Sequence, residues 1–179
     1  MRKTVCTGIL ICLFSGLVGC SSSYNLYESG MFRGKRLLAR GEYGGARDEF
    51  LKAAQGLRDA APLAFAATAC YKAHDLTGAG RFLKEAEALP PDDSFLRIEG
   101  YKSLVLFAQG QKEEGLDALR EYIGFYDDLY PLDSIYEVEA MVETGRVSLA
   151  ALEELLDRQI TTYEERVGQF MTTGTGFGD

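Results

Sequence analysis

The sequence predicts an all-α protein built as a solenoid of helix-turn-helix repeats. Three observations support this fold class. Apolar residues recur at spacings of three and four from about residue 27 to residue 170, and no segment alternates as a half-buried strand would. Short breaks divide this stretch into about eight helices arranged in pairs. A pattern of small and large residues returns after successive breaks at intervals of 33, 36 and 35 residues, which indicates an internal repeat.

The first nineteen residues are expected to be a leader that takes no part in the fold. Arg2 and Lys3 precede an apolar run from Val5 to Val18, and three serines follow Cys20. A helix that spans a bilayer needs roughly 20 apolar residues, and this run is shorter. A basic start, a short apolar centre and a small-residue exit are typical of a signal peptide. An uncleaved membrane anchor is the alternative.

The tetrapeptide Leu17-Val18-Gly19-Cys20 resembles the lipobox of bacterial lipoproteins. In that family the cysteine thiol receives a diacylglycerol and the leader is removed before it. The resemblance implies that Cys20 is lipidated and attaches the protein to a membrane, where several acyl chains hold far more stably than one. By the sorting rule of Gram-negative lipoproteins, Ser21 implies the outer membrane, with the protein facing the periplasm of the cell envelope.

The rest of the chain divides at glycines and prolines. We expect a lipidated cysteine and tether over residues 20–30, a helical domain over residues 27–170 and a flexible Gly/Thr tail over residues 171–179. Within the domain, Pro62 opens a helix, Pro90 and Pro91 close one, and Pro131 separates two more. The other breaks are Gly41 to Gly44, Asp75 to Gly78, Gly110-Gln111 and Thr144 to Arg146.

The repeat is seen by reading fixed offsets of 2, 5, 9 and 12 residues from each turn. The residues at these offsets are Tyr43, Ala46, Phe50 and Ala53 after Gly41; Leu76, Ala79, Leu83 and Ala86 after His74; Lys112, Gly115, Leu119 and Tyr122 after Gly110; and Val147, Ala150, Glu154 and Asp157 after Gly145. This pattern resembles the tetratricopeptide repeat (TPR), a helix-turn-helix unit of about 34 residues. A glycine reverses the chain at the turn, and small residues allow the helices of a pair to approach closely.

The match to the TPR weakens along the chain. There is no Trp in the sequence, His74 replaces glycine at the second turn, and the last unit has Glu154 and Asp157 where apolar and small residues belong. We therefore expect three to four repeats, with the final pair and its long helix over residues 148–169 acting as a cap. A generic helical bundle is the alternative.

The resemblance to the TPR implies a concave groove lined by the first helix of each pair. Its partner-binding residues would be Met31, Lys35, Leu38, Thr68, Tyr71, Lys72, Leu104 and Phe107. Two lysines and two aromatic residues on this face favour a peptide with an acidic group. The expected function is a lipid-anchored adaptor or scaffold that binds a protein or peptide partner in envelope assembly.

Two other functions remain open at this stage. The aromatic stretch from Tyr122 to Tyr136 packs in the core or forms a contact surface, so a self-associating structural lipoprotein that forms a homo-oligomer is one alternative. A small hydrolase or a glycan-binding lipoprotein is the other.

Composition argues against several classes of protein. Acidic residues outnumber basic ones by 27 to 19, so the chain lacks the net positive charge with which proteins bind nucleic acid. The single histidine, His74, lies at a predicted turn, where a helix cap is expected rather than a catalytic base. Cys70 is the one cysteine within the predicted domain and is expected to fill core space. One histidine and one cysteine cannot form a zinc site, so no catalytic residue, metal or cofactor is expected.

Overall fold

The computed structural model describes residues 6–90, 93–128 and 135–173, and the side chains of residues 23–90, 93–124 and 135–170. These residues contain eight α-helices and no strand, as the sequence predicts. The helices are α1 (Cys6–Ala39), α2 (Tyr43–Ala53), α3 (Ala61–Lys72), α4 (Leu76–Glu87), α5 (Phe95–Ala108), α6 (Lys112–Asp128), α7 (Ile135–Thr144) and α8 (Leu149–Thr173).

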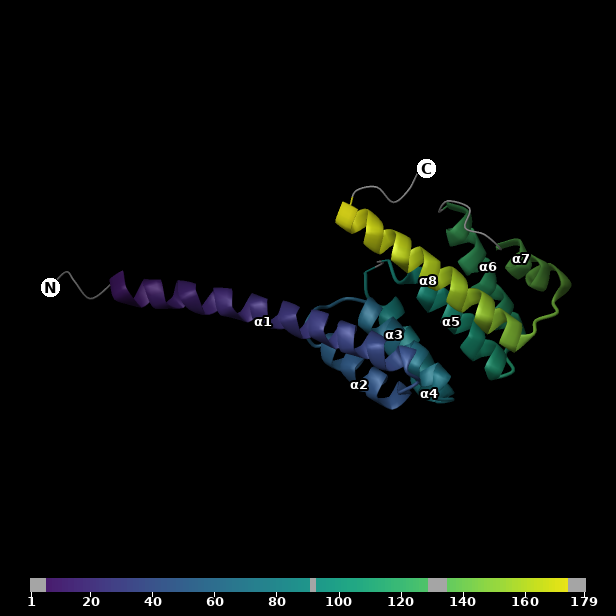
Figure 1. The fold of residues 1–179 in the computed structure, drawn as a ribbon, viewed down its shortest axis with the longest axis horizontal. Helices are drawn as coiled ribbons and strands as arrows, with labels where there is room; N and C mark the ends of the chain where they lie inside the picture. Colours follow the sequence, from purple (N-terminus) through teal and green to yellow (C-terminus); the bar gives the residue numbers. More distant parts are fainter. Residues whose placement is uncertain (1–5, 91–92, 129–134, 174–179) are drawn as a thin grey trace.

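The helices pack mainly against their neighbours in the chain (Figure 1). Three hairpins form from α1 and α2, from α3 and α4, and from α5 and α6. Successive hairpins join where α2 packs on α3 and where α4 packs on α5, and α3 also contacts α5. This order of contacts is consistent with a helical repeat, in which each unit buries its apolar face against the next.

The turns inside the pairs lie at the four positions that the repeat predicts. Gly41, His74, Gly110 and Gly145 have φ of 75°, 61°, 78° and 59°, and no other described residue has a positive φ. The first three follow the first helix of a hairpin, where a residue in the left-handed region satisfies the last carbonyls of the helix. Glu42, Asp75 and Gln111 each donate a backbone N–H to a carbonyl five residues earlier, which closes these turns.

The small and large positions of the repeat are buried in the first three units. Ala46, Phe50 and Ala53 are fully buried, as are Leu119 and Tyr122. Gly34 shows why small residues are needed, because a Cβ there would collide with the ring of Phe50. The fourth unit differs as expected, since Ala150 and Glu154 are exposed.

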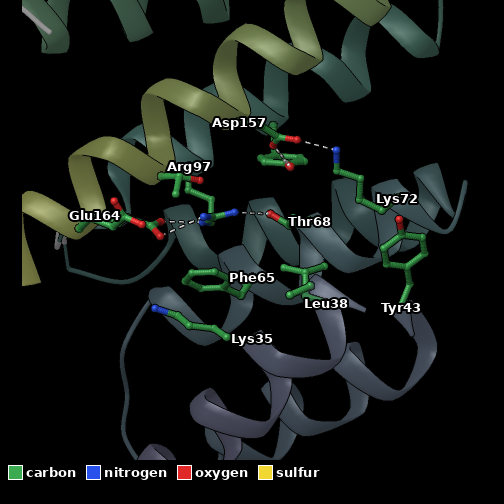
Figure 2. Close-up of a pocket in the computed structure, with 13 residues that line it drawn as sticks. Lys35, Leu38, Tyr43, Phe65, Thr68, Lys72, Arg97, Asp157 and Glu164 are labelled. Carbon is green, nitrogen blue, oxygen red and sulfur yellow. Dashed lines mark hydrogen bonds and ion pairs between the residues drawn. The ribbon is translucent and has the colours of Figure 1, made fainter. Parts of the chain in front are cut away.

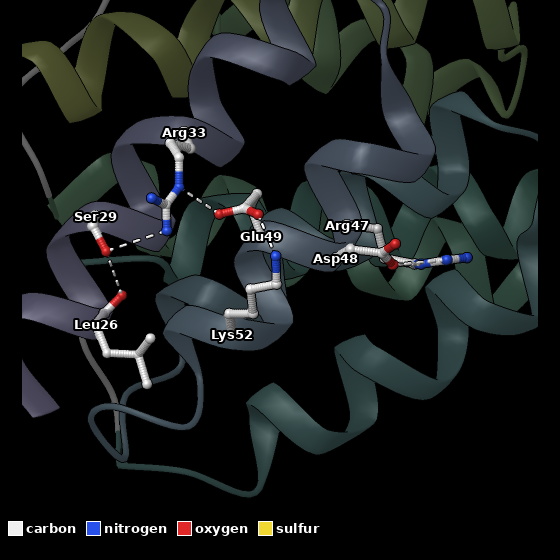
Figure 3. A network of polar contacts seen from close by, with 7 residues as sticks. All are labelled: Leu26, Ser29, Arg33, Arg47, Asp48, Glu49 and Lys52. Carbon is white, nitrogen blue, oxygen red and sulfur yellow. Dashed lines mark hydrogen bonds and ion pairs between the residues drawn. The ribbon is translucent and has the colours of Figure 1, made fainter.

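A chain of polar contacts joins α1 to α2 on the surface of the first hairpin (Figure 3). Arg33 Nε donates to Glu49 Oε2 over 2.6 Å, and Lys52 Nζ lies 2.5 Å from the other oxygen of the same carboxylate. The hydrogen bonds from Lys52 and Arg33 lower the pKa of Glu49, and burial of the carboxylate opposes that shift. The network orients the outer faces of the two helices, but both cations are exposed and the stabilisation is modest.

The last helix does not cap the stack as the sequence predicts. Helix α7 packs on α6, but α8 turns back and packs on α5, antiparallel to it (Figure 1). Its apolar face is buried through Leu152, Leu155, Leu156, Ile160 and Tyr163. The reason lies in the face of α5, where Gly100 leaves room for the ends of Ile160 and Leu156. Helix α8 therefore covers part of the face formed by α1, α3 and α5.

The segment expected to be a tether is helical. Helix α1 runs without interruption from Cys6 through the expected tether to Ala39, and its N-terminal half projects beyond the hairpins (Figure 1). The loop after α2 lies against α1 from Ser23 onward, since a Cβ on Gly56 would meet the backbone of Ser23 and Tyr27. The helix continues because residues 20–29 contain neither proline nor glycine, the residues that usually end a helix.

At the other end, α8 extends to Thr173, three residues beyond the expected end of the domain, and residues 174–179 of the expected tail lie outside the described residues. None of the helices that the structure describes is both long enough and apolar enough to cross a membrane.

Candidate functional site

A solvent-open cleft of about 700 Å³ lies between α8 and the first helices of the three hairpins (Figure 2). Helix α1 contributes Lys35, Leu38 and Ala39, and Tyr43 is the first residue of α2. Helices α3 and α5 form the floor, and α8 forms the opposite wall. The lining residues from these three helices are Phe65, Thr68, Lys72, Arg97, Tyr101, Asp157, Thr161, Glu164 and Glu165.

Phe65 is the aromatic centre of the floor. Its ring is 5 % exposed and packs on Phe50 with centroids 5.2 Å apart. Lys35 Nζ lies 4.6 Å from the ring centroid, and the guanidinium of Arg97 lies 3.9 Å from it. Cations at these distances are attracted by the ring and fix its position. Phe65 therefore closes the bottom of the cleft as a mostly buried ring with positive charge held close to it.

Arg97 is a buried arginine whose charge is neutralised from α8. Its Nε donates to Glu164 Oε1 over 2.7 Å and its Nη2 donates to Oε2 over 3.0 Å. Its third contact is from Nη1 to Thr68 Oγ1 over 3.2 Å, and Thr68 in turn donates to the carbonyl of Ala64. A bidentate pair of this kind is geometrically specific. It holds α8 in register against α3 and α5.

Lys72 is a second cation that α8 neutralises. Its ammonium group pairs with Glu153, and with Asp157 Oδ2 at 2.6 Å. Burial alone lowers the pKa of Lys72, but the hydrogen bonds and charges of Asp157 and Glu153 outweigh burial and raise it. Lys72 is therefore charged at neutral pH and is already paired.

Two tyrosine hydroxyls complete this cluster. Tyr71 donates to Glu153 over 3.3 Å, and Tyr101 donates to Asp157. Burial, followed by the charge of the facing carboxylate, raises the pKa of both tyrosines. The rings also touch each other edge to face at 5.6 Å. These contacts make the α8 wall a fixed part of the cleft.

The cleft continues at both ends into smaller hollows that share its lining residues. One, of about 320 Å³, shares Lys35, Phe65 and Glu164 with the cleft. The other, of about 550 Å³, shares Tyr43 and Lys72. We call the cleft and these two hollows the inner groove. Its further lining residues are Tyr27, Met31, Asp59, Ala61, Asp93, Ser94, Val167 and Gly168 at one end and Tyr71, His74, Leu76, Ala108, Leu149, Ala150 and Glu153 at the other.

The structure brings together most of the groove residues predicted from the sequence. Lys35, Leu38, Thr68 and Lys72 line the cleft itself. Met31 and Tyr71 line the two hollows, although Tyr71 is 7 % exposed.

Leu104 and Phe107 are not groove residues. Leu104 is fully buried in the core. Phe107 packs on α6, where its ring lies 3.0 Å from the place a Cβ on Gly115 would take. Neither residue lines the inner groove, because the cleft crosses α5 near Arg97 and Tyr101 and the hollow beyond Lys72 meets α5 only at Ala108.

Several groove residues were not singled out from the sequence. Arg97 carried a usable signal, because a charged residue inside the apolar stretch of residues 95–108 must find a partner when buried. Its partner, Glu164, carried none, because it is 67 residues away in the chain. Phe65 and Tyr101 lie in apolar stretches of the sequence, and nothing local distinguishes them from core residues.

Cys70 and the described side chains of the aromatic stretch from Tyr122 to Tyr136 lie outside the inner groove. Cys70 is 2 % exposed, as predicted, and burial raises the pKa of its thiol to about 11. In the aromatic stretch, Tyr122 is fully buried and Tyr136 is 66 % exposed; its other aromatic side chains lie outside the described ones. No group of His, Cys, Asp and Glu side chains in the described part of the chain is arranged to hold a metal ion.

No protein-family model matches the chain, and no curated protein matches it closely enough to be called a relative.

Proposed function

We propose that this protein is a lipid-anchored, TPR-like adaptor that binds a peptide segment of a partner protein in the inner groove, on the periplasmic side of an outer membrane. The observation that carries the proposal is the groove itself. Four helices from distant parts of the sequence enclose an open cleft, with Leu38 among its apolar lining residues and the mostly buried Phe65 at its bottom. An apolar floor with a few placed polar groups is the usual form of a binding site.

The turns support the TPR-like assignment. Four left-handed residues at intervals of 33, 36 and 35 residues match the period of that repeat family. Three hairpins stack in chain order, and their first helices share one face. In repeat proteins such a face is the surface used for binding. Helix α8 narrows this face to a groove, which favours an extended segment over a folded domain.

The membrane anchor is proposed from the lipobox-like sequence that ends at Cys20. Because the loop after α2 already packs on α1 at Ser23, only Ser21 and Ser22 separate Cys20 from the packed domain. An acyl chain on Cys20 would therefore hold the domain close to the membrane surface rather than on a long tether.

The anchor is tested by growing the native host with an alkyne fatty acid and fractionating the cells. We expect the full chain to carry the label and to sediment with membranes. Cys20→Ala should lose the label, and Cys70→Ala, which removes the buried cysteine of the domain, should keep it. A labelled Cys20→Ala protein would refute the anchor.

The adaptor function is tested by purifying the full chain from native membranes and comparing two leucine-to-arginine variants. Leu38→Arg places a long cation in the cleft, whereas Leu57→Arg changes an exposed leucine outside the inner groove. We expect Leu38→Arg to lose a co-purifying protein that both the parent and Leu57→Arg retain. Circular dichroism shows whether each variant is folded. Equal recovery of that protein by both variants would contradict the proposal.

A further inference from the structure

The charges of the inner groove are unbalanced. Its lining includes three lysine or arginine side chains against six carboxylates, which are Asp59, Asp93, Glu153, Asp157, Glu164 and Glu165. The whole chain is acidic as well, with a formal net charge of −8. Complementary charge steers association and suppresses partners of the wrong sign. The groove therefore presents a negative field to an approaching segment.

The cations in the groove are occupied. Arg97 is held by both oxygens of Glu164, and Lys72 is held by Glu153 and Asp157. An acidic ligand could reach them only by displacing carboxylates of α8. That helix is fixed by five buried apolar side chains, so displacement would break its ion pairs with α3 and α5 and leave partly buried carboxylates without a cation. The sequence analysis expected an acidic peptide because two lysines lie on this face. Lys72 is already paired, so only Lys35 remains available to such a peptide.

The free charges in the groove are mostly negative. Among the described residues, Glu165 on α8 and Asp93 before α5 line the groove and take part in no ion pair. Lys72 carries one positive charge but faces two carboxylates, Glu153 and Asp157. One negative charge of this cluster therefore has no cation to balance it. A lysine or arginine of a ligand would add a cation to these groups without displacing any existing contact.

The size of the groove sets the length of the ligand. Its lining runs along α8 from Leu149 to Gly168, which spans roughly 28 Å of helix axis. An extended chain of about nine residues covers that distance at ~3.3 Å per residue. The central part of this path crosses Phe65 and Leu38, where an apolar side chain would be held.

From these observations we propose that the inner groove selects an extended, basic segment with an apolar residue at its centre, supplied by a partner protein. This inference rests on the proposed adaptor function and names the chemistry of the partner. Specificity arises from repulsion of acidic segments as well as attraction of basic ones.

The test uses the full chain in detergent micelles and a synthetic pool of randomised peptides about nine residues long. Bound peptides are recovered and sequenced by mass spectrometry. We expect Lys and Arg to be enriched at least about threefold over the input pool and Asp and Glu to be depleted. High salt should reduce the enrichment, because part of it is a screened interaction.

Three variants connect the enrichment to the groove. Glu165→Lys should reduce the basic preference by more than about half, and Lys35→Glu should increase it. Glu121→Lys is the matched control, since it makes the same charge change at an exposed position on α6 outside the groove. It should leave the preference unchanged.

Several outcomes would overturn the inference. These are enrichment of acidic peptides, no charge preference, no peptide retained, or equal effects of Glu165→Lys and Glu121→Lys. The adaptor function fails separately, when Leu38→Arg and Leu57→Arg recover the same native partner equally. A partner lost only by Leu38→Arg, together with acidic peptides in the pool, would keep the adaptor function and refute the basic ligand.

Discussion

At the scale of the residue, one turn of the repeat is built from an unfavourable amino acid. His74 has φ of 61°, whereas Gly41, Gly110 and Gly145 occupy the equivalent turns. A side chain costs roughly 1–2 kcal/mol in the left-handed region, and glycine avoids that cost. His74 lines the inner groove together with Tyr71 and Lys72. The residue with the unfavourable backbone conformation therefore belongs to the candidate site.

Replacing His74 tests this account of the turns. His74→Gly should raise the free energy of unfolding by about 0.5 kcal/mol, because relief of strain slightly exceeds the added entropy of the unfolded chain. Gly110→Ala, the reverse change at an equivalent turn, should lower it by about 1 kcal/mol. Urea denaturation measures both changes. Changes of the same sign in the two variants would contradict the assigned turn geometry.

Cys70 provides a second prediction at this scale. Its thiol is buried and its pKa is raised to about 11, so the reactive thiolate is scarce at neutral pH. Iodoacetamide at pH 8 should leave Cys70 unmodified in the folded full chain and modify it fully in urea, as peptide mass spectrometry would show. Rapid modification in the folded chain would show that α3 is not packed as described.

Single residues also show what the sequence was able to predict. The four turns and the buried positions around them follow from local rules on glycine, small residues and helix periodicity, and all four turns were placed correctly. Leu104 and Phe107 were misassigned because the face that a helix presents to a distant neighbour is not a local property. The floor residues Phe65 and Tyr101 were missed for the same reason.

At the scale of the element, α8 decides the form of the site. Local sequence predicts that it is a helix, but its packing depends on Gly100 of α5 and on ion pairs that span 67 and 85 residues of sequence. A cap on the end of the stack was therefore the natural expectation and was wrong. The helix instead lies along the groove with its acidic residues turned toward Lys72 and Arg97 (Figure 2).

The contact between Tyr101 and α8 predicts a response to alkaline pH. Burial and the charge of Asp157 raise the pKa of Tyr101 above its ordinary value of 10.0. The unfolded chain then loses this proton at lower pH than the folded chain does. The contribution of Tyr101 to stability is therefore fully present below pH 10 and is lost as pH rises above it.

This dependence is measured by urea denaturation between pH 8 and pH 11. The free energy of unfolding should fall less steeply above pH 10 in Tyr101→Phe than in the parent chain. Tyr136→Phe, which changes an exposed tyrosine, should retain the slope of the parent. If Tyr101→Phe kept the parental slope, Tyr101 would not hold α8 through a protonated hydroxyl.

At the scale of the whole molecule, three hairpins and a returning helix form one groove. The hairpins supply the floor and one wall, α8 supplies the other wall, and the N-terminal part of α1 extends beyond the stack (Figure 1). With Cys20 proposed as the anchor, the groove would be presented near a membrane surface. The central claim is that a partner segment binds in this groove.

The most direct test of that claim is photocrosslinking of the full chain in its native host. A photoreactive residue is placed at Lys35 or at Thr161, on the two walls of the cleft, and at Lys84 as an exposed control on α4. Mass spectrometry identifies the trapped species. We predict that both groove positions trap the same partner through one segment of its chain and that Lys84 does not. Equal trapping of that partner at Lys84, or capture of only the protein itself at the groove positions, would contradict the account.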